Sequence, residues 1–447
     1  MPAIAGIPIV KIGMVSLGCP KTLVDSEIIL GKLTGAAYEL THKIEDCDVA
    51  LLNTCTFIQD AQKESIDRIL ELIELKKRKQ IKAVVVMGCM VQRFPEELRN
   101  ELTEVDAFIG SGDYSRIPEV VEKVSRGKKF MHVGEPGYLS SSQDQRVALT
   151  PLHYRYIKIS EGCDHICTFC TIPSFRGKHR SRSIEDILIE AHALCRQGAR
   201  ELLLTGQDTT YFGKDTSGEF LLPELIRAMD SVKSLEWFRL LYAYPACLTE
   251  EMMKAMRDSK KMCHYLDMPL QHASDRMLQA MKRGITQRRT YDLIRKFRSI
   301  VPDLTIRTTF IVGFPGETDQ DFQELLDFIS GVRFERVGIF TYSQESGTPA
   351  AELPDQVPEK IKKERFKAAM LLQQQVSREH LKRFVGQNLK VLIEKKRGAD
   401  SYEGRSYMDA PEIDGAVRVE SGKLLETGQF YSVKITGSRE YDLLGCV

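Results

Sequence analysis

Three cysteines, Cys163, Cys167 and Cys170, lie within eight consecutive residues of the chain. Thiolates at this spacing can all bind one soft metal centre, and they are too crowded to form separate structural disulfides. Three thiolates are one ligand short of a closed tetrahedral zinc site, and one short of capping every iron of a 4Fe-4S cluster. The spacing therefore predicts a metal centre with an open coordination position, where chemistry can take place.

The alternative is a zinc knuckle that takes its fourth ligand from a nearby histidine, either His165 or His179. The CxxxCxxC motif follows an apolar run at residues 154–159 that has the character of a strand. A cysteine loop of exactly this spacing after a strand is a highly specific pattern, and it favours the open centre over the closed zinc site.

A second set of cysteines, Cys19, Cys55 and Cys89, ends three predicted strands in the sequences SLGC, LNTC and VMGC. Because the carboxyl ends of parallel strands meet at one edge of a sheet, we expect the three thiols to converge. Gly18 and Gly88 precede two of them and allow a tight turn there. The alternative is three unrelated buried cysteines, since free cysteine is among the most buried residue types. Core packing is the simpler explanation for the remaining five, Cys47, Cys195, Cys247, Cys263 and Cys446.

The length and composition of the chain limit the classes of protein to which it can belong. A chain of 447 residues exceeds one hydrophobic core, so two or three domains are expected. Its formal net charge of +1 implies no global attraction to a polyanion. The sequence has no run of eighteen apolar residues and no signal-peptide pattern at its start, so a cytoplasmic location without membrane contact is expected. Eleven cysteines in such a chain point to metal or redox chemistry.

The N-terminal part, residues 10–125, alternates short apolar strands with amphipathic helices. The predicted strands are at residues 11–17, 49–53, 83–87 and 107–109. Short apolar runs between helices are typical of a parallel sheet covered on both faces, and they predict a flavodoxin-like α/β domain. Residues 126–150, rich in Ser, Gly, Gln and Asp from residue 134 onward, are predicted to form a linker.

The rest of the chain is predicted to form two further domains. Residues 151–383 contain six strand–helix units and a long final helix, which indicates a partial (βα)6 barrel with its site at the carboxyl mouth. The six strands are predicted at residues 155–160, 201–205, 237–242, 265–268, 304–312 and 337–342. Five short strands in residues 384–447 predict a small antiparallel β-barrel of OB-like design, a kind of domain that commonly binds RNA or proteins.

Polar and glycine residues follow several barrel strands. Arg176, Arg180 and Arg182, after the cysteine loop, have the right charge for an acidic group of a ligand, although a solvated basic face is the commoner explanation. His272, near another strand end, is expected to be a structural histidine.

The cysteine loop, including Phe169 just before the last cysteine, resembles the cluster motif of the radical S-adenosylmethionine (SAM) superfamily. The resemblance implies that Cys163, Cys167 and Cys170 hold a 4Fe-4S cluster whose open iron binds SAM, and that one electron from the cluster cleaves SAM to a radical that abstracts hydrogen. It also implies contacts with SAM from residues after two other strands, namely Thr205, Gly206, Gln207, Gly313 and Gly316. An ordinary turn explains each of these two stretches equally well.

Taken over its whole length, the chain resembles the methylthiotransferase family of radical SAM enzymes, in which a three-cysteine domain and a C-terminal TRAM domain flank the barrel. The resemblance implies that Cys19, Cys55 and Cys89 hold a second 4Fe-4S cluster, which presents the sulfur. It also implies that SAM is both methyl donor and radical source, and that an electron donor of low potential and a sulfur donor are needed. No catalytic side chain beyond the cluster ligands is predicted.

Two branches of this family differ in substrate: one modifies an adenosine in transfer RNA, and the other the β-carbon of an aspartate in ribosomal protein S12. Residues 15–27, 158–163, 172–178 and 404–415 resemble the second branch, with Thr22, Asp164 and Ile166 as departures beside the cysteines. Contact with RNA is expected to be secondary.

The charge of the C-terminal domain favours the same branch. Residues 384–447 carry nine Lys and Arg against ten Asp and Glu, whereas a domain that grips tRNA should be basic. The acidic loop at residues 409–414 is expected to repel RNA and attract a basic ribosomal protein, although the basic run 395–397 has the charge to serve RNA locally. The alternatives are a tRNA adenosine methylthiotransferase and a non-catalytic two-cluster protein that docks on ribosomes or relays electrons. Electron relays usually close their clusters with four cysteines, which disfavours the last one.

Overall fold

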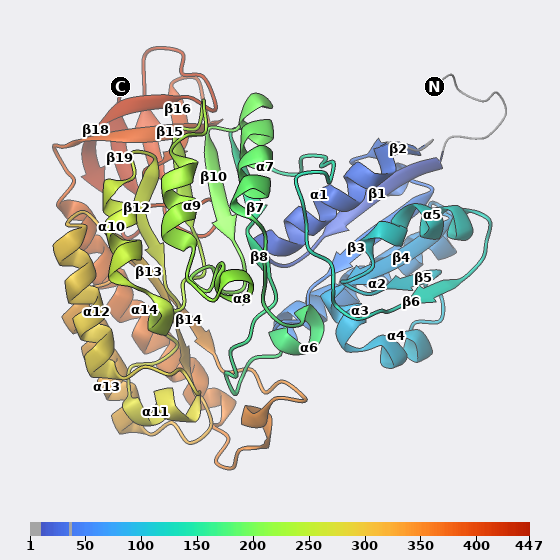
Figure 1. Cartoon of the computed structure of the whole chain (residues 1–447), viewed down its shortest axis with the longest axis horizontal. Coiled ribbons are helices and arrows are strands. Elements are labelled where there is room, and N and C mark those ends of the chain that lie inside the picture. The colour runs from blue at the N-terminus through green and yellow to red at the C-terminus, as the bar shows by residue number, and fades with distance from the viewer. Residues whose placement is uncertain (1–9, 35–37) are drawn as a thin grey trace.

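The computed structural model describes residues 10–34 and 38–447 (Figure 1). The N-terminal domain is a parallel sheet in the order β2-β1-β3-β4-β5-β6. Its strands are β1 (Val10–Ser16), β2 (Tyr38–Thr41), β3 (Val49–Thr54), β4 (Ala83–Gly88), β5 (Ala107–Ile109) and β6 (Phe130–His132). The four strands predicted from the sequence are confirmed, and every residue of β3 and β4 is buried, as in a sheet covered on both faces.

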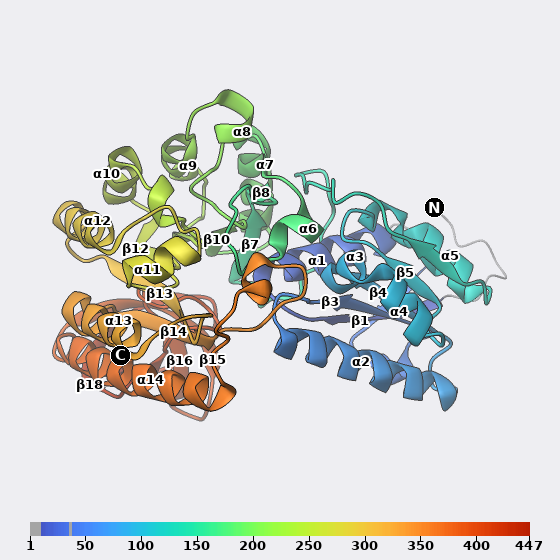
Figure 2. The same ribbon diagram turned by 90° about the horizontal axis from the view of Figure 1, so that it is seen from below.

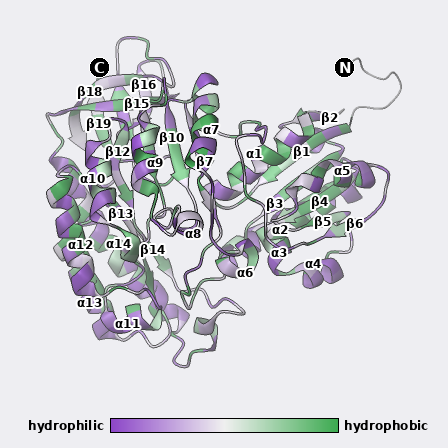
Figure 3. Ribbon diagram, viewed as in Figure 1, coloured by the Kyte–Doolittle hydropathy of each residue, from purple (hydrophilic) through white to green (hydrophobic). Residues whose placement is uncertain are grey.

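Helices cover both faces of this sheet. They are α1 (Pro20–Thr34), α2 (Gln59–Lys77), α3 (Cys89–Arg93), α4 (Pro95–Glu101) and α5 (Ile117–Ser125), with short 3-10 turns η1 (Ile44–Asp46) and η2 (Tyr114–Arg116). Figure 2 shows α1 and α2 on opposite faces, where Ile29 packs in one apolar cluster and Ile69 in the other. In Figure 3 the central strands are the hydrophobic layer, and the outer surface of α4 is hydrophilic.

The predicted linker holds a strand. β6 lies within residues 126–150 and pairs in parallel with β5, extending the N-terminal sheet by one strand. Three residues are too few to show a strand period, which is why the sequence pattern missed it. Residues 134–150 contain no helix or strand and run along α1, where the Val147 N–H donates to the carbonyl of Glu27. The domain boundaries at residues 125, 150 and 383 stay predictions.

The second domain is the predicted open barrel of six parallel strands, in the order β14-β13-β12-β11-β10-β7. The strands are β7 (Tyr154–Lys158), β10 (Glu201–Thr205), β11 (Trp237–Leu240), β12 (Met262–Asp267), β13 (Thr305–Val312) and β14 (Arg336–Thr341). The helices and 3-10 turns of this domain are α6 (Ile172–Arg176), α7 (Ile184–Arg196), α8 (Lys214–Ser217), α9 (Leu222–Met229), η3 (Pro245–Cys247), α10 (Glu250–Asp258), α11 (Asp275–Ala280), α12 (Gln287–Ile300), α13 (Asp319–Val332), η4 (Pro349–Glu352) and α14 (Glu359–Lys382). Among the described residues, no helix is long and apolar enough to cross a membrane.

A two-stranded antiparallel ribbon encloses the cysteine loop. β8 (Ser160–Glu161) pairs with β9 (Arg180–Ser181), and Glu161 lies opposite Arg180. The chain between them, from Gly162 to His179 in sequence, carries the three cysteines and α6. α6 lies against α3 of the N-terminal domain (Figure 1). The ribbon therefore presents the cysteine loop to the sheet edge where β4 ends.

The C-terminal domain is a closed five-stranded barrel in the order β15-β16-β17-β19-β18. Its strands are β15 (Asn388–Lys396), β16 (Ser401–Arg405), β17 (Val417–Glu420), β18 (Phe430–Ser438) and β19 (Leu443–Cys446). The predicted barrel is confirmed, but it is not wholly antiparallel, because β17 and β19 pair in parallel where the barrel closes.

Two of the three carboxylates in the acidic loop at residues 409–414 are not free to attract a partner, so the prediction was wrong for Asp409 and Asp414, whereas Glu412 is exposed. Asp409 is buried and pairs with Arg336 at the start of β14. Asp414 accepts a hydrogen bond of 2.6 Å from the Tyr265 hydroxyl, and it lies 3.5 Å from Arg307. Two carboxylates that are neutralised by arginines of the barrel dock the C-terminal domain on it, and they do not contribute a free negative charge to the surface of the loop.

Candidate functional site

The cysteines of the N-terminal domain converge at the carboxyl edge of its sheet. Cys19, Cys55 and Cys89 follow β1, β3 and β4, which are neighbours in the sheet. A Cβ atom at Gly18 would lie 3.1 Å from Cys55 Sγ, so the turn that carries Cys19 passes directly over Cys55. All three thiols are free of disulfides. Three soft donors at one half-buried edge fit a thiolate-ligated metal cluster.

The environments of these thiols differ. Burial raises the pKa of Cys89 to about 12, and the charges of Cys55 and Cys19 add to this effect. Burial also raises the pKa of Cys55. Burial opposes the Cys19 thiolate too, but the charge of Lys21 and hydrogen bonding by Thr22 outweigh it and lower the pKa of Cys19.

The second group of thiols lies in the loop between β8 and α6. The backbone folds tightly there, since the Cys170 N–H donates to the carbonyl of Cys167 at 3.1 Å. Burial raises the pKa of Cys163 and of Cys170 to about 12, and neighbouring thiolates contribute to both shifts. Arg283 Nη1 donates to Cys167 Sγ at 3.2 Å. This donor set also fits a metal cluster, which would replace the thiol protons.

A buried network of charges lies between the two groups of cysteines. Lys158 Nζ lies 2.7 Å from Glu161 Oε2 and also pairs with Asp25 of α1. Arg176 Nη1 lies 2.8 Å from Asp25 Oδ2, and its Nη2 donates to Cys89 Sγ at 2.9 Å. Two cations and two carboxylates from two domains therefore meet beside a thiol of the N-terminal group.

The expectation of a solvated basic face was wrong for two of the three arginines after the cysteine loop. Arg176 and Arg182 are both 5% exposed. Arg182 pairs with Asp186 and Glu190 of α7. Arg180 is only partly buried and donates to the carbonyls of the loop, at residues 176 and 178. The partner of Arg176, Asp25, lies on α1 of the other domain, so no local sequence pattern reveals the burial of Arg176, whereas Asp186 follows Arg182 by only four residues.

The residues after β10 contain polar atoms that lack a partner. Thr205 Oγ1, Gln207 Oε1 and the neighbouring Ser160 Oγ are buried, and within the described chain none of them has a hydrogen-bond partner. Gly206 lies beside Ser160, because a Cβ there would be 2.5 Å from Ser160 Oγ, and its carbonyl accepts from Lys21 Nζ at 3.3 Å. Buried polar atoms without partners are rare in native proteins, and a group of them fits a bound polar ligand.

The glycine turn after β13 makes its contacts within the chain. Gly313 has a φ of +73°, and a Cβ there would lie 2.3 Å from Lys362 Cγ, so only glycine fits. The Gly316 N–H donates to the carbonyl of Asp355 at 2.9 Å. His272 is the structural histidine that we expected, because it is buried and lies 3.0 Å from Glu317 Oε1. A role of these glycines in binding SAM stays a prediction.

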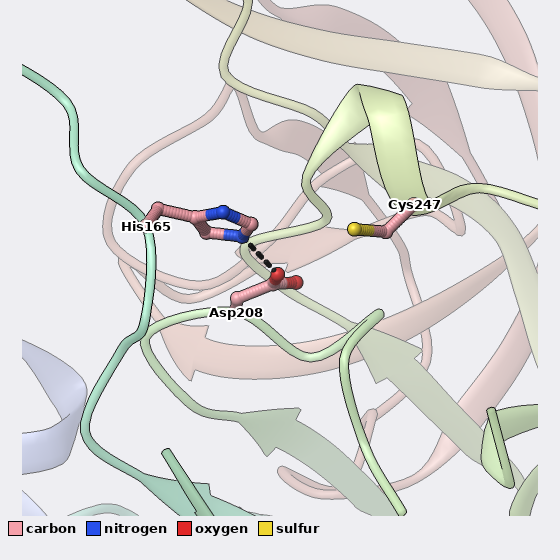
Figure 4. A group of neighbouring side chains, drawn as sticks. All are labelled: His165, Asp208 and Cys247. Atoms are coloured by element: carbon pink, nitrogen blue, oxygen red, sulfur yellow. Dashed lines mark hydrogen bonds and ion pairs between the residues drawn. The ribbon is translucent and has the colours of Figure 1, made fainter. Parts of the chain in front are cut away.

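His165, in the second cysteine loop, lies close to Asp208 and Cys247, a grouping that the sequence did not predict (Figure 4). His165 Nε2 lies 2.6 Å from Asp208 Oδ2, and the His165 ring stacks on Tyr244 with centroids 3.6 Å apart. The ligand atoms of His165, Asp208 and Cys247 all lie within 4.8 Å of one another, and Cys247 is only partly buried. The other histidine considered as a zinc ligand, His179, lies 3.1 Å from Ser181 Oγ. Asp208, directly after the polar turn of β10, was the available signal for this group.

Three protein-family models match successive parts of the chain. The family model for the radical SAM superfamily matches residues 157–329, and the TRAM domain matches residues 385–447. The uncharacterized protein family UPF0004 matches residues 11–110, which hold the N-terminal cysteines. The order of the three matches is that of the three domains in the structure.

Curated relatives match the chain over nearly its full length. The ribosomal protein uS12 methylthiotransferase RimO of Pelotomaculum thermopropionicum is 48% identical over 98% of this chain and 99% of its own. The proteins of the same name from Heliobacterium modesticaldum and Geobacter sulfurreducens are 47% identical (97% of this chain, 94% of theirs) and 43% identical (97% and 98%).

Among solved structures, the radical SAM methyltransferase TsrM of Kitasatospora setae, bound to cobalamin and a [4Fe-4S] cluster, has a similar fold. Its TM-score is 0.55 at 14% identity, with 76% of this chain and 77% of that chain covered. The matched models, the full-length identity and the two cysteine groups agree, and the chain belongs to the radical SAM methylthiotransferase family, whose enzymes use SAM and 4Fe-4S clusters.

Proposed function

We propose that this enzyme adds a methylthio group to the β-carbon of an aspartate in the small-subunit ribosomal protein uS12. The observation that carries the proposal is the presence of two groups of three cysteines, each one ligand short of closing a cluster, on facing parts of two domains. The names of the full-length relatives support the substrate. The charge of the acidic loop at residues 409–414 does not support this substrate, because Asp409 and Asp414 pair with arginines of the barrel domain.

The two groups of cysteines are assigned to two clusters. Cys163, Cys167 and Cys170 would hold the cluster that binds SAM, and the N-terminal group at the end of β1, β3 and β4 would hold the second cluster. When bound, the first cluster with SAM supplies one-electron chemistry that opens an unactivated C–H bond, and the second supplies the sulfur. The division explains why one chain carries two incomplete donor sets.

The chain's own residues bind and position these groups. The oxygens of Thr205 and Gln207 that lack partners are suited to accept hydrogen bonds from an ammonium group such as that of SAM. Phe169 packs against the apolar cluster of Met277 and Phe314 and closes one side of the loop to water. Ile166, which is 72% exposed between two of the cysteines, leaves another side open to a second molecule.

The partners follow from this chemistry. The reaction needs an electron donor of low potential and a sulfur donor, and a ribosomal protein as substrate would place the enzyme in the cytoplasm. RNA contact would be secondary and limited to basic stretches such as residues 395–397.

The test uses anaerobically reconstituted full-length protein that holds about eight irons, as two 4Fe-4S clusters require. It is incubated with SAM, dithionite and sulfide, and uS12 and unmodified tRNA are offered in parallel. The proposal predicts a methylthio mass gain on one aspartate of uS12 and unchanged tRNA. A gain on tRNA alone would move the substrate to the other branch of the family. No gain on either, with both clusters intact, would favour the non-catalytic alternative.

A further inference from the structure

Arg176 reaches from the barrel domain to a cysteine of the N-terminal domain. It ends α6, six residues after Cys170, and its Nη2 lies 2.9 Å from Cys89 Sγ. The same short segment therefore carries a ligand of one proposed cluster and a hydrogen-bond donor to a ligand of the other. The guanidinium is charged, so this contact is a charge-assisted hydrogen bond to the sulfur.

The guanidinium is held in this orientation by two carboxylates. Its Nη1 lies 2.8 Å from Asp25 and 3.4 Å from Glu161, and Lys158 pairs with the same two carboxylates. The two cations and the two carboxylates of this network have a net charge of zero, to which a Cys89 thiolate would add one negative charge. The planar fork of arginine lets one nitrogen face the carboxylates while the other faces the sulfur, which an ammonium group cannot do with the same geometry.

Burial makes this contact strong. Arg176 is 5% exposed, Asp25 is fully buried and Cys89 is 6% exposed. At a site with little water, a positive charge on a ligand sulfur is poorly screened. Reduction adds one negative charge to a cluster, and hydrogen bonds to the sulfurs, local charge and solvent exposure set the potential at which this happens.

We propose that Arg176 is a positioning residue that donates to Cys89 and raises the reduction potential of the N-terminal cluster. The inference rests on the proposed function, because it requires that Cys19, Cys55 and Cys89 hold that cluster. It goes beyond that function because it states that the segment carrying Cys163, Cys167 and Cys170 also controls the reduction potential of the N-terminal cluster. The contact between the two domains, through Arg176 and Cys89, then sets the potential at which the N-terminal cluster is reduced.

The test isolates the N-terminal cluster in the full-length chain by replacing Cys163, Cys167 and Cys170 with Ala. Iron analysis of this parent protein tests the proposed function separately, because about four irons should remain if the N-terminal cysteines hold a 4Fe-4S cluster. The cluster is then titrated with dithionite and mediators, and the reduced form is followed by electron paramagnetic resonance. Arg176→Gln is compared with Arg182→Gln, a control that removes an equally buried arginine whose side chain pairs with Asp186 and Glu190.

At a fixed ambient potential, Arg176→Gln should lower the ratio of reduced to oxidised cluster at least tenfold, which is about 59 mV for a one-electron couple. Arg182→Gln should leave the ratio within a factor of two, and Arg176→Lys, which keeps the charge without the fork, should fall between. Equal potentials in the parent and in Arg176→Gln would overturn the proposal.

Two further measurements keep the test decisive if Arg176→Gln fails to assemble the cluster. The double variant Asp25→Asn with Arg176→Gln removes one positive and one negative charge together with the hydrogen bond to Cys89, and it should show a downward shift of smaller size. The parent chain with Cys163, Cys167 and Cys170 replaced by Ala, labelled with ¹⁵N-arginine, should show a weak ¹⁵N coupling to the reduced N-terminal cluster in pulsed electron paramagnetic resonance, because the other arginine donor to a cysteine, Arg283, has lost its partner Cys167. An absent coupling would mean that the contact with Cys89 does not exist in the loaded protein.

Discussion

Gly18 and Gly88 show how single residues shape the sulfur-bearing edge. Both have left-handed backbone torsions, with φ of +95° and +98°, and each directly precedes a cysteine. A Cβ at Gly88 would lie 2.2 Å from Asn53 Oδ1 and 3.0 Å from the carbonyl of Thr54. The turn therefore needs glycine for its torsion and also for its close approach to β3.

We predict that Gly88→Ala destabilises the N-terminal domain by about 1–3 kcal/mol, through strain at φ of +98°, and displaces Cys89. The measurement is the thermal midpoint of the apoprotein together with the iron bound after reconstitution. Gly127→Ala is the matched control, because Gly127 also has a positive φ, of +74°, but open space around it. Equal losses in the two variants would show that the close contact with β3 is unimportant.

At the scale of elements, α14 holds the barrel and the C-terminal domain together. It runs for 24 residues and buries Ala369, Val376 and Leu381 along one side. Near its end, His380 is buried among arginines. Burial, together with the charges of Arg383 and other arginines nearby, lowers the pKa of His380 to about 3.

This shift predicts a loss of stability in acid. In the unfolded chain His380 has its ordinary pKa of about 6.5 and is protonated below that pH. In the folded chain its pKa is about 3, so it is protonated only in much stronger acid. Between these values the unfolded state holds more protons, so the free energy of unfolding falls with falling pH, by at most about 1.4 kcal/mol per pH unit from this group.

His380→Gln should flatten the dependence of the thermal midpoint on pH between 7 and 5. His264→Gln, which removes an imidazole paired with the exposed Asp303, is the control for general effects of losing a histidine. Parallel curves for His380→Gln and the parent would contradict the buried, neutral state of this residue.

At the scale of the whole molecule, buried ion pairs fix the C-terminal domain to the barrel. Arg405 of β16 lies 2.5 Å from Glu201 at the start of β10 and 2.9 Å from Glu394. Arg239 of β11 also pairs with Glu201, and it donates to the carbonyls of residues 406 and 407. The C-terminal barrel thus packs at residues near the amino ends of the strands, whereas the cysteine loop follows the carboxyl end of β7.

We predict that Arg405→Met weakens this docking by about 3–5 kcal/mol, because it leaves the buried carboxylate of Glu201 with one partner fewer. Hydrogen exchange of β16 and limited proteolysis after α14 should both increase. The control is Arg418→Met in the same domain, which breaks an exposed pair with Asp442 and should cost less than about 1 kcal/mol. Unchanged exchange of β16 in Arg405→Met would show that apolar packing alone holds the domain.

The sequence predicted what local patterns encode and missed what depends on contacts between domains. Buried apolar runs predicted the strands of both sheets, and the cysteines after β1, β3 and β4 do lie at one edge of the sheet, where these three strands are neighbours. The burial of Arg176 depends on Asp25, which lies on another domain, and the pairing of His165 with Asp208 joins residues 43 apart. Neither contact leaves a periodic signal. The acidic loop was misjudged for the same reason, because its arginine partners lie on distant strands.

If both groups of cysteines serve one modification, mass spectrometry of uS12 treated with three forms of the enzyme tests this most directly. The unsubstituted enzyme should add one methylthio group to an aspartate. A variant with Cys19, Cys55 and Cys89 replaced by Ala, and another with Cys163, Cys167 and Cys170 replaced, should add none while each keeps about four irons. Methylthiolation by either variant would contradict the division of labour between the two clusters.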